Sequence, residues 1–185
     1  MNIELQDLYQ KTMIQHGNNP LNFGKPQEYE HTEEGFNALC GDKINIYFSS
    51  IDNKEVNFSF VSVGCIICKA SGSLMTKELN KKDLENIEAS IDNAMIGINK
   101  GNLKDDFFSN ELMTKELNKK NLENIEASID HAMIGINKGN LKDDFFSNEL
   151  MTLNQIKNFP SRLKCALLPW ETAMRLLNNM DNNAR

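Results

Sequence analysis

The chain has 185 residues, of which 40% are hydrophobic and 25% charged, as in ordinary globular proteins. The sequence lacks the run of about 20 apolar residues that a membrane-spanning helix needs. The N-terminal segment has neither the basic flank nor the apolar stretch of an export signal, so we expect a cytoplasmic protein. A net charge of −6 and the lack of a basic stripe argue against a nucleic-acid partner.

The first half of the chain predicts one helix, two strands and a second helix. Apolar residues at helical spacing predict an amphipathic helix over residues 3–15, with one side formed by Ile3, Leu5, Leu8, Tyr9 and Met13. Helix breakers at 16–20 end it, and a polar loop is expected to about residue 36. Alternating apolar residues then predict two strands between 44 and 63, built on Ile44, Ile46 and Phe48 and on Val56, Phe58 and Phe60. A further helix is predicted from about Cys65 towards Leu79.

Residues 74–111 recur almost unchanged as residues 112–149. Only two positions differ: Asn121 replaces Asp83, and His131 replaces Asn93. Stacked repeat proteins usually need about three diverged units, so two near-identical copies indicate a tandem duplication within a single domain over residues 1–185. Each copy predicts one helix, with apolar faces formed by Leu84, Ile87, Ile91, Ala94, Met95 and Ile98 and by Leu122, Ile125, Ile129, Ala132, Met133 and Ile136.

After the copies, a helix is predicted from Pro160 through Cys165, and Pro169 is expected to break or restart it. The order of helix, strands and helices predicts an α+β fold: a small antiparallel sheet with helices on one face and a metal site at one edge. The surplus copy supplies an extra helix. Because its apolar face needs a cover, we expect a dimer or higher homo-oligomer.

The four cysteines are expected to remain thiols in the cytoplasm. Cys40 precedes the first predicted strand, Cys65 lies where a strand gives way to a helix, and Cys165 lies in the last helical region. Together with the carboxylate of Asp42, these three thiolates make a four-ligand set that suits Zn²⁺ or, with bridging sulfides, iron. The alternative is that they are buried small hydrophobic residues, and spacing alone does not choose between the two.

Four segments together resemble the U-type iron–sulfur cluster assembly scaffolds, the family of IscU and the NifU N-terminal domain. They are LYQKTMIQHGNNPLNFG, LCGDKI, SFVSVGCIICKASGSLMT and FPSRLKCALLPWETA. Two details resemble the SufU branch: Lys164 precedes the third cysteine, where IscU-type proteins carry histidine, and the segment between Cys65 and Cys165 is long.

This resemblance implies that Cys40, Asp42, Cys65 and Cys165 hold zinc or a [2Fe–2S] cluster. It further implies that Cys40 accepts sulfur from a cysteine desulfurase, with Arg162 near the site, and that the cluster passes to apo iron–sulfur acceptor proteins. Such a protein is an assembly scaffold and not an enzyme. Two alternatives remain open: a structural zinc-binding interaction module, and a scaffold impaired by the duplication.

Several other residues have simpler interpretations. Cys68, three residues after Cys65, is expected to pack against the sheet, the alternative being an auxiliary thiol. His16 is expected to make a hydrogen bond that fixes its loop, and His31 to be solvated in an acidic loop. Trp170 is expected to pack the last helix.

Overall fold

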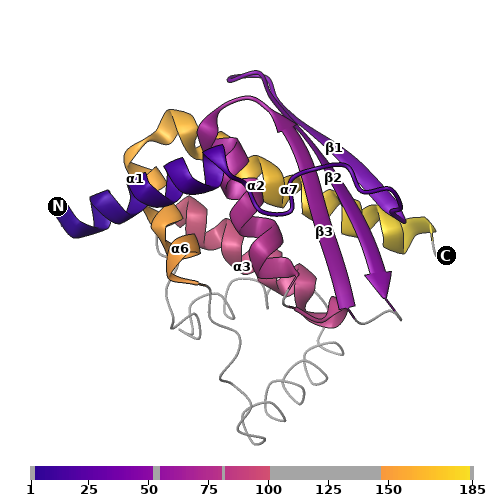
Figure 1. Cartoon of the computed structure of the whole chain (residues 1–185). Helices are drawn as coiled ribbons and strands as arrows, with labels where there is room; N and C mark the ends of the chain where they lie inside the picture. The colour runs from indigo at the N-terminus through magenta and orange to yellow at the C-terminus, as the bar shows by residue number, and fades with distance from the viewer. Residues whose placement is uncertain (1–2, 52–54, 81, 101–146, 184–185) are drawn as a thin grey trace, which may run out of the picture. The chain divides into compact units, whose positions relative to one another are not determined.

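The computed structural model describes residues 3–51, 55–80, 82–100 and 147–183. These residues belong to one of two units into which the chain divides, Met1–Leu103 with Ser147–Arg185. Their elements, in chain order, are α1 (Ile3–Asn18), β1 (His31–Asn37), β2 (Asp42–Ile51), β3 (Glu55–Val63), α2 (Ile66–Leu79), α3 (Leu84–Lys100), α6 (Asn148–Met151), the 3-10 helix η1 (Thr152–Asn158) and α7 (Pro160–Asn183) (Figure 1). The single domain over residues 1–185 stays a prediction.

The three strands form one antiparallel sheet in the order β1-β2-β3. Ile46 of the central strand β2 pairs with Phe60 of β3, and the two predicted alternating runs are buried on the helix-covered face, which confirms them. The expected loop up to residue 36 is wrong, because His31–Asn37 forms the edge strand β1. A polar edge strand lacks apolar alternation, and it forms here because β2 supplies its hydrogen-bond partners.

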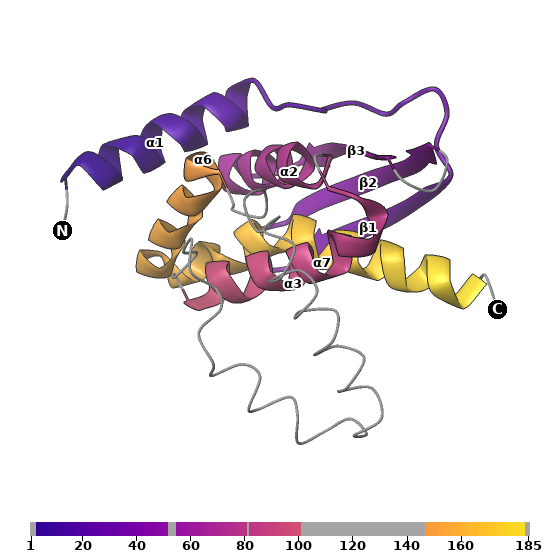
Figure 2. The same cartoon turned by 90° about the horizontal axis from the view of Figure 1, so that it is seen from below.

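Helices α2 and α7 cover the sheet, α2 against β3 and α7 against β1 and β2. Helix α1 packs instead on α2 and η1, and α3 packs on α7 and η1 (Figure 2). The predicted α+β class, a small antiparallel sheet with helices packed on it, is therefore confirmed. The predicted extra helix of the second copy lies outside the described residues.

The faces of the helices agree in part with the predictions. In α1 the buried side chains include Tyr9 and Met13, whereas Leu8 is exposed, contrary to expectation, because the buried side is centred on Met13 and His16. In α3 the predicted face is confirmed for Ile87, Ile91, Ala94 and Ile98, which are completely buried, whereas Leu84 and Met95 are half-buried.

Helix α7 runs unbroken through Pro169, so the expected break is wrong. Proline has no N–H to donate to the carbonyl of Cys165 four residues earlier, which costs one helical hydrogen bond. Burial of the residues on both sides, from Cys165 to Trp170, offsets this loss. Among the described residues, no helix has the length and apolar character needed to cross a bilayer.

Candidate metal centre

The turn between β1 and β2 presents Cys40 and Asp42. The backbone carbonyl of Asn37 accepts hydrogen bonds from the backbone N–H groups of Cys40 (3.3 Å) and Gly41 (2.8 Å). Gly41 has a φ of +72°, a left-handed conformation that glycine adopts without steric cost. Asp42 then starts β2 on the same side as Ile44, so its side chain faces the helices and is fully buried.

Cys65 follows β3 and caps the N-terminus of α2. Its backbone N–H donates to Asp42 Oδ1 (2.7 Å), and its Sγ lies 3.4 Å from Asp42 Oδ2. Gly64 makes this approach possible: it has a φ of +148°, and a Cβ built there would lie 2.2 Å from Asp42 Oδ1. The sequence thus places a residue without a side chain where the carboxylate must fit.

Cys165 reaches the same place from α7, which packs across β1 and β2. Its Sγ lies 3.2 Å from Cys40 Sγ. One ligand atom each from Cys40, Asp42 and Cys165 lie within 4.8 Å of one another. The structure therefore brings together all four residues singled out in the sequence, with Cys65 joined to the group through Asp42.

The electrostatics of this cluster favour a bound cation. Burial and hydrogen bonds to Asp42 and Cys40 raise the pKa of the Cys165 thiol well above its ordinary value. Asp42 is buried, and within the described part of the chain no lysine or arginine forms an ion pair with it. Three thiols and a carboxylate crowded together repel one another once ionised, and a metal ion removes that repulsion. The donor set, three sulfurs and one oxygen, fits zinc or iron.

Arg162 is the cation beside the cluster. Its Nη1 lies 3.8 Å from Cys40 Sγ, and the side chain is exposed to solvent. A hydrogen bond to Cys165, and then the charges of Cys40 and Cys65, raise the pKa of the Arg162 guanidinium. This position agrees with the resemblance, which placed an arginine near the site.

Two residues of the site were missed in the sequence. Asn37 is buried, and its Nδ2 lies 3.5 Å from Cys165 Sγ while its Oδ1 accepts from the N–H of Leu39. The second contact is a turn in which an asparagine side chain bonds the backbone two residues on, a recognised local signal. The second residue is Gly64, whose missing side chain leaves the space that the Asp42 carboxylate occupies.

The other thiol and the two described histidines lie outside the cluster. Cys68 is buried as expected, burial raises the pKa of its thiol, and its backbone N–H donates to Cys65 Sγ. His16 makes hydrogen bonds, as expected, to Ser73 and Glu149. His31 is not in a solvated loop: it starts β1, half-buried, with its ring centroid 6.3 Å from that of Phe48. Trp170 packs α7 as expected, and its Nε1 donates to Ser71.

Thiols and a carboxylate gathered at one end of the sheet of a small α+β protein are typical of proteins that handle metals or sulfur. The sequence profile of the NifU-like N terminal domain matches residues 8–129, and the chain belongs to this family. It is similar to the iron–sulfur cluster assembly scaffold protein IscU of Thermotoga maritima, at 25% identity over 94% of both chains. It is also similar to the zinc-dependent sulfurtransferase SufU of Bacillus subtilis, at 31% identity over 45% of this chain and 56% of that protein.

Two crystal structures share the fold. One is a putative iron–sulfur cluster assembly scaffold protein for the SUF system from Fervidobacterium islandicum, with a TM-score of 0.61, 22% identity, and coverage of 93% of this chain and 98% of that one. The other is the N-terminal part of a NifU-like protein from Brucella abortus, with a TM-score of 0.61, 16% identity and 96% coverage of both chains. At these identities the likeness concerns the fold alone.

Proposed function

We propose that this chain is an iron–sulfur cluster assembly scaffold or sulfur acceptor whose Cys40, Asp42, Cys65 and Cys165 hold zinc or a [2Fe–2S] cluster. The observation that carries the proposal is the meeting of these four side chains, from the β1–β2 turn, the end of β3 and the middle of α7. The names of the relatives, a cluster assembly scaffold and a zinc-dependent sulfurtransferase, support it.

The mixed ligand set suits a cargo that must be released. Thiolates bind zinc and iron firmly, whereas a carboxylate oxygen is the weaker, more exchangeable ligand. Asp42 is held by the backbone N–H of Cys65, so its Oδ1 is already engaged and Oδ2 faces the sulfurs. A purely structural zinc site has no reason to prefer this oxygen to a fourth cysteine or histidine.

Cys40 is the proposed sulfur acceptor, and a cysteine desulfurase is the proposed partner. Cys40 is half-buried on a turn whose neighbour Leu39 is 75% exposed, whereas Cys165 is fully buried. The Cys40 thiolate attacks the terminal sulfur of the partner's persulfide. A new S–S bond forms at Cys40, the partner's S–S bond breaks, and the electron pair leaves on the partner's cysteine as a thiolate. The exposed Arg162, whose Nη1 lies 3.8 Å from Cys40 Sγ, is the proposed hydrogen-bond donor to this sulfur.

Two matched cysteine variants test this assignment. Cys40→Ser is expected to abolish stimulation of a cysteine desulfurase, because serine supplies no thiolate, while Cys68→Ser retains most of it because Cys68 is buried. Sulfide release by the desulfurase is the measurement. Equal loss in both variants would show that both thiols are required and would overturn the assignment to Cys40 alone.

The nature of the bound group is decided by anaerobic purification followed by iron, zinc and sulfide analysis. A cluster gives iron and acid-labile sulfide in equal amounts, whereas a zinc-bound sulfur acceptor gives about one zinc per chain and no sulfide. Absence of both groups from protein purified and reconstituted under these conditions would contradict the proposal.

A further inference from the structure

Asn37 contacts both the turn that presents Cys40 and the sulfur of Cys165 in the proposed metal centre. It ends β1 opposite Asp42 in the strand register and is 6% exposed. Its backbone carbonyl holds the turn that presents Cys40, through bonds from Cys40 and Gly41. Its side-chain Oδ1 accepts from Leu39 N (3.1 Å), which fixes the orientation of the amide and leaves Nδ2 towards Cys165 Sγ.

We propose that Asn37 is a positioning residue that sets the electron donation and the placement of the Cys165 sulfur through an N–H···S hydrogen bond. The inference rests on the function proposed above. A hydrogen bond to a thiolate withdraws electron density from it, and removal of a second-shell group of this kind commonly weakens metal binding by about 10- to 100-fold. A neutral amide can do this without adding a charge that competes with the bound cation.

Asn37→Asp tests the inference because aspartate keeps the shape and the acceptor for Leu39 but loses the donor. Asn57→Asp makes the same charge change at an exposed position of β3 and is the control. Both are titrated with Co²⁺, whose thiolate-to-metal charge-transfer band reports sulfur donation directly. We expect Asn37→Asp to bind Co²⁺ about 10- to 100-fold more weakly and to shift the band to lower energy, with Asn57→Asp unchanged.

Asn37→Ser, which keeps a short donor and acceptor, is expected to lie between wild type and Asn37→Asp, and it decides the question if Asn37→Asp fails to fold. Wild-type affinity and band position in the Asn37 variants would overturn the inference while leaving the proposed function intact. If the wild-type protein itself shows no thiolate-to-cobalt band, the proposed function fails, and this inference fails with it.

Discussion

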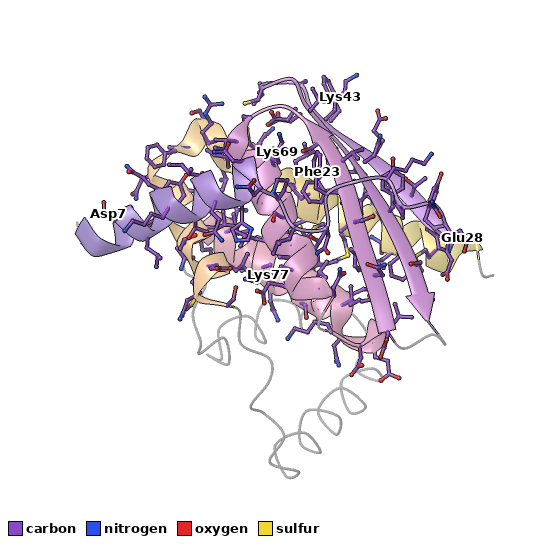
Figure 3. All side chains as sticks on the ribbon, viewed as in Figure 1. Asp7, Phe23, Glu28, Lys43, Lys69 and Lys77 are labelled. Atoms are coloured by element: carbon purple, nitrogen blue, oxygen red, sulfur yellow. The ribbon has the colours of Figure 1, made fainter. Side chains whose placement is uncertain are left out.

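Two polar clusters in this protein differ both in their residue types and in their charge balance. At the cysteine end of the sheet, a buried carboxylate and three thiols meet without a buried cation among the described residues. Between α1, α2 and α6, the side chains of His16, Ser73, Lys77 and Glu149 meet instead. Of these, Lys77 on α2 is labelled in Figure 3. The first cluster offers its donors to an external cation, as proposed above, whereas the carboxylate of the second pairs with a lysine of the chain itself.

The polar groups of the second cluster form a chain of hydrogen bonds. The Leu21 N–H donates to Ser73 Oγ (2.7 Å), and Ser73 lies 2.8 Å from His16 Nδ1. His16 Nε2 then faces Glu149, which also pairs with Lys77. His16 is therefore a structural residue, and the two clusters differ in whether a cation of the chain itself pairs with the carboxylate.

The largest effect is expected when the cysteine cluster loses its oxygen ligand, Asp42. Asp42→Ala should weaken Zn²⁺ binding by at least about tenfold, because one of four protein ligands is removed, while Asp7→Ala on the exposed side of α1 should bind as wild type. Competition with a chromogenic chelator measures the affinity. The same variant should release an assembled cluster to an apo acceptor more slowly, followed by absorbance, because the exchangeable ligand is gone. Release as fast as in the wild type would make Asp42 a bystander.

Two glycines with nearly the same φ angle allow the effect of backbone strain to be separated from displacement of the Asp42 carboxylate. Gly64 and Gly24 have φ values of +148° and +149°, but only at Gly64 would a Cβ meet Asp42; at Gly24 nothing lies within 4 Å. Alanine at either position should cost about 1–3 kcal/mol of unfolding free energy from strain. Only Gly64→Ala should also weaken Zn²⁺ binding. Equal zinc affinity in the two variants would show that the carboxylate tolerates displacement.

The strands built on apolar alternation and the apolar faces of the helices could be predicted from the sequence, because their apolar residues recur at periods of two or 3.6. It also indicated that Cys40 and Cys65 lie at strand ends. It could not show that α7 crosses the sheet so that Cys165 meets Cys40, because that contact depends on packing between elements 125 residues apart. The edge strand β1 was missed because it carries little apolar signal, and the role of Gly64 because a close approach is a property of the folded chain.

The smallest effect is expected in the cluster of His16, Ser73, Lys77 and Glu149, and it depends on pH. The hydrogen bond from Lys77, and then the contact with His16, hold the pKa of Glu149 below its ordinary value of 4.5. Because the folded pKa is the lower one, this ion pair stabilises the fold above about pH 4.5 and is lost as the pH falls through the folded pKa. Glu149 is 35% exposed in its side chain, so solvent screening limits the contribution to about 0.2–1 kcal/mol.

Glu149→Gln should therefore be less stable than the wild type at pH 7 and nearly equal to it at pH 3, as measured by urea unfolding. The duplication supplies the control, since Glu111 occupies the same place in the first copy as Glu149 in the second. Helix α6 begins with Asn148 directly before Glu149, so the anchor for His16 and Lys77 belongs to the second copy. Glu111→Gln should leave the pH dependence unchanged. A loss in Glu111→Gln equal to that in Glu149→Gln would mean that both copies share this anchor, and the contrast between the two clusters would then hold for only part of the molecules.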